Sequence, residues 1–248
     1  MNSGALDLAG TSVIDAQVEV AKVARMLARA RLVTAFGHVS VRLPGGAMAI
    51  SSTRPLILAR PEDTVIVSAD GELLAGAVDD APLERWLHAS IYRARADVRG
   101  ICRGHSDAVV AWGTSLSDLP LLHGLGLLVG RRVPVHSERR LISNVQLAEA
   151  AAASLADNSA VLLHTNGGLA VGSTALQAAA RLWALEDRAR VALAAPASPE
   201  VTSPEPVDIW AEREAATSIE LARTERWFET LFTEAPSTAD YRVKELHA

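Results

Sequence analysis

The densest group of residues that could do chemistry lies between residues 82 and 107, in the sequence PLERWLHASIYRARADVRGICRGHSD. Glu84 and His88 are four residues apart, so on a helix their side chains project from one face. The apolar run that follows ends in Arg103 and His105, as expected of a strand that delivers two polar side chains. Such a cluster predicts either a metal site or an acid–base site. A solvated helix with ordinary surface charges is the alternative.

The elements that must position these residues follow from hydrophobic periodicity. Helices are predicted over residues 13–30, 82–96, 144–155 and 208–232, with a long helix after a cap at Ser173 or Thr174. Strands are predicted at 39–43, 47–51, 64–68, 72–76, 99–104, 133–135, 160–163 and 169–172, the first four as two hairpins. This order predicts an α/β fold with a central, largely antiparallel sheet.

Composition limits the class of protein. The chain has 248 residues, 49% of them apolar, which is enough for one large core. We expect a domain at 1–195, a Pro-rich connection at 196–207, and a C-terminal helix and tail at 208–248 that pack on the same domain or on a neighbouring subunit. The net charge of −5, with no basic block, argues against a nucleic-acid partner.

Several other kinds of protein are not expected from this sequence. No apolar run is long enough to span a bilayer, and the N-terminus lacks the pattern of a secretion signal. We therefore expect a cytoplasmic enzyme with no membrane partner. Cys102 is the only cysteine, so a disulfide framework is excluded, and its apolar surroundings predict a core residue.

Four segments, in chain order, resemble the class II aldolase/adducin family. FGHVSVR (36–42) resembles its G-N-x-S-x-R loop, and APLE with WLH and IY (81–92) resembles its P-S-S-E…H…Y helix. GICRGH (100–105) resembles the strand that ends in H-x-H, and VLLHTNGGLAVG (161–172) resembles L-L-x-x-H-G-x-x-x-x-G. The resemblance spans residues 15–195. It implies a single three-layer αβα domain, usually a fourfold-symmetric homotetramer with active sites between subunits.

The sequence departs from the family at the metal site. Aldolases of the family hold a divalent metal with three histidines, together with a glutamate that acts as base or ligand. Glu84 and His105 match, but Arg103 and Asn166 stand where two of the histidines belong. Arginine cannot ligate a cation, and asparagine is a weak ligand for zinc. No cofactor is therefore favoured. The alternative is a rebuilt divalent-metal site made from His88, His105, His164 and Glu84.

The substrate end departs from the family as well. His38 stands where the family has asparagine, and Pro82 and Leu83 replace two serines. The remaining arginines still favour an anion, because guanidinium groups bind carboxylates in a bidentate way. A small-molecule carboxylate with an apolar or aromatic body is expected rather than a sugar phosphate. The expected substrate-binding residues are His38, Ser40, Arg42, Ser52, Thr53, Arg54, His123, His136 and Asn166.

Within the family, the motifs look closest to the decarboxylases of aromatic-degradation pathways, which act on dihydroxyphthalate-type or hydroxy-carboxy-dienoate substrates. Cleavage of a C–C bond leaves negative charge that must be stabilised on an oxygen. The hypothesis is that Arg103 and Asn166 hold the leaving carboxylate or the oxyanion. His105 and His88 would orient the substrate oxygen, and Glu84 would supply the proton, which requires a raised pKa.

Three alternatives remain open at this point. Glu84 and Arg103 could form an internal ion pair, in which case the proton would come from a histidine. The protein could instead be a metal-dependent aldolase or epimerase with a rearranged ligand set. It could also be a catalytically silent, adducin-like oligomer.

Overall fold

The computed structural model describes residues 12–195 and 207–233. The predicted connection at 196–207, except residue 207, and the predicted tail after residue 233 lie outside the described residues. The helices are α1 (Val13–Arg29), α2 (Arg85–Ala94), α3 (Asp107–Trp112), α4 (Val145–Leu155), α5 (Ala175–Ala194) and α6 (Val207–Thr233). The strands are β1 (His38–Arg42), β2 (Met48–Ile50), β3 (Val65–Val67), β4 (Leu73–Ala75), β5 (Gly100–Gly104), β6 (Val135–His136), β7 (Ala160–Leu163) and β8 (Gly168–Gly172).

The eight strands form one sheet in the order β4-β3-β2-β1-β5-β8-β7-β6. Every neighbouring pair is antiparallel except β6 and β7, which are parallel. The predicted α/β class and largely antiparallel sheet are therefore confirmed. Strands β1 and β5 are central, and their register places His38 directly opposite Arg103.

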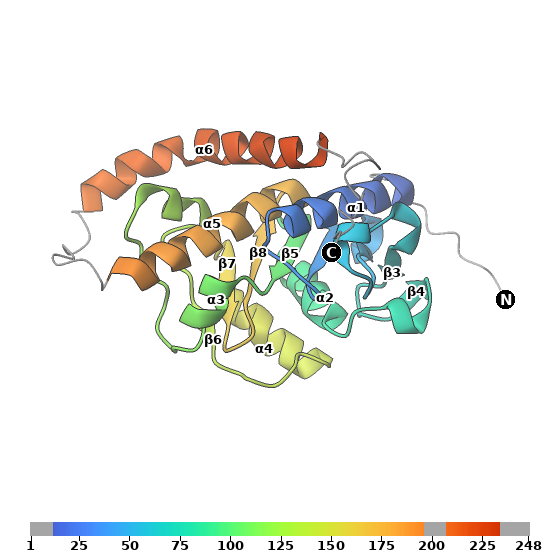
Figure 1. The fold of residues 1–248 in the computed structure, drawn as a ribbon. Helices are drawn as coiled ribbons and strands as arrows, with labels where there is room; N and C mark the ends of the chain where they lie inside the picture. Colours follow the sequence, from blue (N-terminus) through green and yellow to red (C-terminus); the bar gives the residue numbers. More distant parts are fainter. Residues whose placement is uncertain (1–11, 196–206, 234–248) are drawn as a thin grey trace, which may run out of the picture.

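Helices cover both faces of the sheet, and each face has its own hydrophobic core (Figure 1). Strand residues such as Val39 and Cys102 pack with α1 and α5, whereas Ile101 and Leu169 pack with α2 and α4. Helix α6 lies outside α5 and α1 and buries Leu221 and Phe228. Helix α6 therefore adds an outer layer that the predicted three-layer αβα architecture does not include.

Most predicted elements are confirmed, but two need correction. The strand expected at 133–135 is shorter, with two residues, and is shifted to Val135–His136. The helix expected from residue 82 begins at Arg85, so Glu84 is the N-cap residue and lies outside the helix that carries His88. A carboxylate at this position is favourable because the amino end of a helix carries partial positive charge.

Strand β1 and helix α2 match in spacing. Alternate residues of β1 point toward α2, because successive strand side chains face opposite sides of the sheet. Two strand residues advance about 6.7 Å and four helical residues about 6 Å, so partners recur at nearly the same interval. The contacts pair His38 with Glu84, Ser40 with His88 and Tyr92, and Arg42 with Tyr92.

Arg42 closes this series of contacts at the far end of α2. Its Nη2 donates to the backbone oxygens of Tyr92 and Arg95, and its guanidinium stacks on the Tyr92 ring. We expect Arg42→Met to lower the free energy of unfolding by about 2 kcal/mol, because two carbonyls lose a charged donor. Urea unfolding measures this change. Arg60→Met removes an exposed arginine 4.0 Å from Glu62 and is the matched control. Equal effects of the two substitutions would contradict the assignment.

Candidate active site

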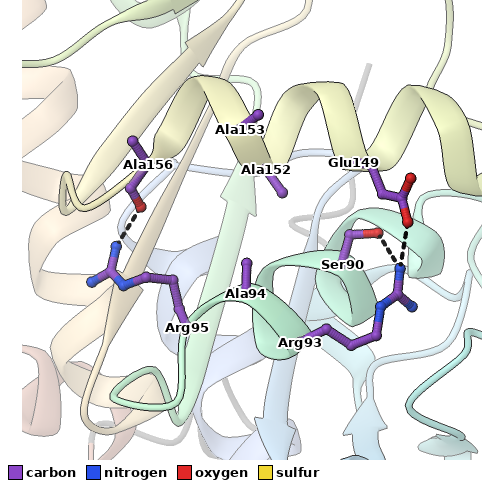
Figure 2. Close-up of a pocket in the computed structure, with 8 residues that line it drawn as sticks. All are labelled: Ser90, Arg93, Ala94, Arg95, Glu149, Ala152, Ala153 and Ala156. Atoms are coloured by element: carbon purple, nitrogen blue, oxygen red, sulfur yellow. Dashed lines mark hydrogen bonds and ion pairs between the residues drawn. The ribbon is translucent and has the colours of Figure 1, made fainter.

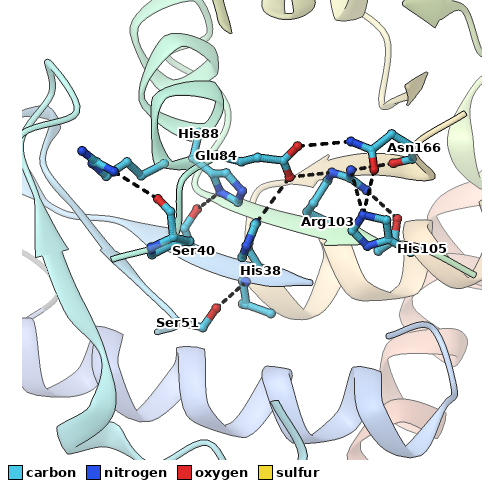
Figure 3. Close-up of polar contacts among 12 residues, drawn as sticks. His38, Ser40, Ser51, Glu84, His88, Arg103, His105 and Asn166 are labelled. Carbon is cyan, nitrogen blue, oxygen red and sulfur yellow. Dashed lines mark hydrogen bonds and ion pairs between the residues drawn. The ribbon is translucent and has the colours of Figure 1, made fainter. Parts of the chain in front are cut away.

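Polar side chains from four segments meet beside the end of β5 (Figure 3). Strand β1 contributes His38, the N-cap of α2 contributes Glu84, and β5 contributes Arg103. His105 follows β5, and Asn166 lies in the turn between β7 and β8. Sequence analysis ranked all five as site residues, and the structure brings them together.

Arg103 is the centre of this group. The side chain is fully buried and is not among the residues that line the neighbouring cleft. Nε lies 3.2 Å from Glu84 Oε2, and Nη2 lies 3.1 Å from His105 Nε2. The remaining contacts are to the backbone oxygens of Gly104 (2.6 Å), Gly168 (3.4 Å) and Asn166 (2.5 Å). Since these partners occupy the guanidinium, Arg103 organises the site from behind, whereas the sequence-based hypothesis gave it direct contact with the substrate.

The turn after β7 approaches β5 closely because Gly167 has no side chain. Its φ is +77°, and a Cβ at this position would overlap the Gly104 oxygen and lie 3.0 Å from Arg103 Nη1. Glycine tolerates such backbone angles at little cost. This close approach brings the Asn166 carbonyl to Arg103 and the Asn166 side chain to the cleft.

The carboxylate of Glu84 bridges the group. It is 4% exposed. One oxygen lies 3.2 Å from Arg103 and 3.7 Å from His38 Nδ1, and the other accepts a 3.5 Å hydrogen bond from Asn166 Nδ2. The internal ion pair that sequence analysis kept as an alternative is present.

The histidines of the site are held in the neutral form. Burial, followed by the positive charge of Arg103, lowers the pKa of His38 to about 3 and that of His105 to about 4. Burial is also the main reason why the pKa of His88 is well below its ordinary value. Neutral imidazoles can accept a hydrogen bond from a substrate hydroxyl at one nitrogen and donate one from the other.

His88 lies behind the cleft and supports the group. Its Nδ1 is 2.7 Å from Ser40 Oγ, which is 2.8 Å from the Tyr92 hydroxyl. The Tyr92 hydroxyl also donates to the Arg99 carbonyl at 3.4 Å, and burial raises its pKa. The His88 ring packs edge-on against His38, with 5.9 Å between the ring centroids. His88 and Ser40 therefore position His38.

A cleft of about 450 Å³ opens over the polar group. Its inner wall carries His38, Glu84, His105 and Asn166, and its outer part carries Thr53 and Arg54. The remaining walls are mostly apolar and consist of Ala35, Phe36, Gly37, Pro82, Leu83 and Leu141. The cleft thus combines a neutral, hydrogen-bonding end with an apolar body and one exposed cation.

Two large apolar residues that line the cleft, Phe36 and Leu141, are not among the site residues expected from the sequence. Phe36 belongs to the FGH motif, and that motif was the signal that could have identified it. Leu141 comes from a segment that carries no motif, so only the tertiary structure places it.

Several expected site residues lie elsewhere. Arg42 binds backbone oxygens at the carboxyl end of α2, and the buried Ser52 hydroxyl accepts a 3.5 Å hydrogen bond from the Arg54 N–H. The other three expected residues are histidines with partners outside the cleft. His123 faces Asp187 at 3.7 Å, His136 contacts Ser154 at 2.8 Å, and His164 accepts a 3.0 Å hydrogen bond from Arg139.

The residues present do not fit a divalent metal. Within residues 12–195 and 207–233, no three His, Cys, Asp or Glu side chains converge as ligands. The alternative set is also divided, because His164 pairs with Arg139 and His88 pairs with Ser40. A permanently charged guanidinium lies where Glu84 and His105 converge, and it would repel a second cation.

A second cavity, of about 470 Å³, lies between α2 and α4 (Figure 2). Its polar side chains are engaged by neighbouring protein groups. Arg93 contacts Glu149 at 3.3 Å and Ser90 at 3.1 Å, and Arg95 donates to the Ala156 carbonyl at 2.7 Å. The rest of its lining consists of alanines, and its one carboxylate, Glu149, is paired with Arg93.

Comparison with known proteins agrees with this fold. Residues 18–193 match the family described as class II aldolase and adducin N-terminal domain. The 3,4-dihydroxyphthalate decarboxylase of Rhodococcus jostii (strain RHA1) is 28% identical over 198 residues, which cover 74% of this chain and 82% of that protein. The 5-deoxy-D-ribulose 1-phosphate aldolase of Bacillus thuringiensis serovar kurstaki is 31% identical over 120 residues, which cover 48% of this chain and 55% of that protein.

The fold is also that of solved aldolase structures. An L-fuculose 1-phosphate aldolase superposes with a TM-score of 0.76 at 22% identity, over 86% of this chain and 100% of that chain. None of the helices in the described part of the chain has the length and apolar character needed to cross a membrane.

The neutral histidines predict a pH dependence of stability. Unfolded histidine has a pKa near 6.5, above the values of about 4 for His105 and about 3 for His38 in the fold. The unfolded state therefore binds more protons below about pH 6.5, so the free energy of unfolding decreases as the pH is lowered below that value, by up to about 1.4 kcal/mol per pH unit for each histidine.

This slope can be measured by urea unfolding between about pH 7 and about pH 5. His38→Gln removes one titrating group and should flatten the slope relative to the unsubstituted protein. Parallel slopes for the two proteins would show that His38 is not held neutral by the fold.

Proposed function

Because the chain belongs to the class II aldolase and adducin family, we propose that it is a carbon–carbon lyase that decarboxylates an aromatic or unsaturated hydroxy-carboxylate. The observation that carries this proposal is the composition of the cleft. A hydrogen-bonding end made of Glu84, His38, His105 and Asn166 adjoins an apolar body with one exposed arginine. The relatives named 3,4-dihydroxyphthalate decarboxylase support the same substrate class.

The cleft suits a planar acid better than a sugar phosphate. Phe36, Leu83 and Leu141 offer apolar surface to a ring. A sugar would instead require more hydrogen-bonding side chains in the cleft for its hydroxyl groups. Arg54 lines the same cleft and offers planar donors to a carboxylate. A substrate with two carboxylates would place one at Arg54 and the other at the polar end.

The chemistry proposed at the polar end uses groups that line the same end of the cleft. The bond from the ring carbon to the carboxylate breaks, CO2 leaves, and the electron pair remains on the substrate. Charge is relayed to an adjacent oxygen, which His105 and Asn166 orient. Because Glu84 is paired with Arg103 and the nearby histidines are neutral, the proton that carbon receives comes from solvent, and Glu84 and His38, 3.7 Å apart, relay it. The net reaction consumes one proton for each CO2 released.

Aldol cleavage of a phosphorylated substrate is the second candidate. The aldolase from B. thuringiensis favours it, and Arg54 could receive a phosphate as well as a carboxylate. The proposal also includes a homo-oligomer, and the family resemblance favours a tetramer. Apolar Phe36, Leu83 and Leu141, exposed around the cleft, offer a surface that a neighbouring subunit would cover.

Glu84→Gln tests the proposed chemistry. We expect CO2 release from a panel of hydroxyphthalates, and we expect the substitution to lower kcat by at least about 100-fold, because an amide cannot exchange a proton. Glu62→Gln, which changes an exposed carboxylate, is the control. Circular dichroism confirms that each variant folds. Near-wild-type turnover by Glu84→Gln would remove Glu84 from the chemistry, and cleavage of sugar phosphates alone would favour the aldolase.

Arg54→Met tests the recognition of the second carboxylate. We expect KM for a dicarboxylate to rise about tenfold or more with little change in kcat, because the lost contact binds ground state and transition state alike. Arg54→Lys should restore part of the affinity. Arg60→Met, a nearby exposed arginine outside the cleft, is the matched control. An unchanged KM in Arg54→Met would assign Arg54 to its ion pair with Asp63, 3.2 Å away, rather than to substrate.

A further inference from the structure

We propose that Arg103 is the resident cation of this site and that the site works without a bound divalent metal ion. The guanidinium lies where Glu84, His105 and Asn166 converge, 3.2 Å from the carboxylate, 3.1 Å from the imidazole nitrogen and 2.5 Å from the Asn166 carbonyl. It is fully buried. The inference concerns the proposed active site, but it does not depend on which substrate that site takes.

The atoms around Arg103 are the kinds that bind metal ions. They are a carboxylate oxygen, an imidazole nitrogen and backbone oxygens, each of which presents a lone pair. Arg103 can only donate, so its contact with His105 uses the lone pair of Nε2, whereas the tautomer with a proton on Nε2 donates to Asn166 Oδ1, 3.2 Å away. The carboxylate and carbonyl lone pairs that could hold a metal are directed at N–H donors of Arg103.

Charge supports the same conclusion. Glu84 is the carboxylate within ion-pair distance of Arg103, so the pair is close to neutral overall. A divalent ion placed among these groups would lie beside a permanent positive charge in a buried environment, where repulsion is weakly screened.

Arg103 is then a positioning residue. It is not among the residues that line the cleft, and it acts through three groups that are, Glu84, His105 and Asn166. The guanidinium holds these groups in the arrangement that a metal ion would otherwise impose, with the difference that a chelator cannot remove it.

Metal content tests the proposal directly. Tag-free protein expressed with added zinc and manganese is analysed by elemental analysis beside Glu84→Gln and His105→Asn, either of which would remove a ligand. We expect the unsubstituted protein to hold no more metal than the variants, a difference of less than about one ion per ten chains. A difference of about one ion per chain would overturn the proposal, because it would show a metal held by Glu84 or His105.

Arg103→His gives a second, independent readout. This variant removes the cation and adds a third ligand beside Glu84 and His105, so zinc should raise its melting temperature by several degrees and leave that of the unsubstituted protein unchanged. Equal shifts in both proteins would contradict the proposal. No shift in the variant would also contradict it, because the surrounding groups would then not converge on one point.

A third comparison needs neither metal nor substrate. Arg103→Met leaves Glu84 buried without its counterion, whereas the double substitution Arg103→Met with Glu84→Gln removes both charges. The double variant should melt above the single variant Arg103→Met. A lower melting temperature for the double variant would mean that Arg103 is not the counterion of Glu84. Failure of these three measurements would leave the CO2-release assay as a separate test of the proposed function.

Discussion

The arrangement around the cleft depends on one buried cation. Arg103 carries a charge that it cannot lose, and a charge removed from water must find hydrogen-bonding partners nearby. The partners come from the N-cap of α2, the end of β5 and the turn between β7 and β8. Residues more than sixty positions apart in the chain are held together by this requirement. The same contacts orient Glu84, His105 and Asn166 toward the cleft.

A second constraint is the matched repeat of β1 and α2. Strand and helix advance by similar distances over two and four residues, so His38 and Ser40 each meet a partner on or beside the helix. The Glu84 carboxylate at the N-cap of α2 thereby lies close to the His38 imidazole on β1. The pairing also buries His38 and His88, which keeps both imidazoles neutral close to the Arg103 charge.

Most of the fold, and about half of the site, could be predicted from sequence, because local patterns determine hairpins, helix caps and strand ends. Thr174 does cap α5, and Arg103 does end a strand. Helical spacing placed Glu84 inside α2, but tertiary contacts with Arg103 and Asn166 hold it at the N-cap. The partners of the buried Arg103 guanidinium include a carbonyl in the turn between β7 and β8, 63 positions along the chain. A local sequence pattern cannot predict such a contact. Leu141 could not be predicted as a cleft residue either, because only the tertiary structure brings it to the cleft.

Arg103 and Arg54 have different electrostatic roles at the cleft. Arg103 is fully buried and its charge is balanced by Glu84, so it contributes geometry but little net charge to the inner wall. The histidines there are neutral, so an anionic substrate finds little attraction at that end. Arg54 is exposed and lines the outer part of the cleft. Affinity for an acid should therefore depend mainly on Arg54, while the geometry of bond cleavage depends on Arg103, and substitutions at the two positions should affect different kinetic constants.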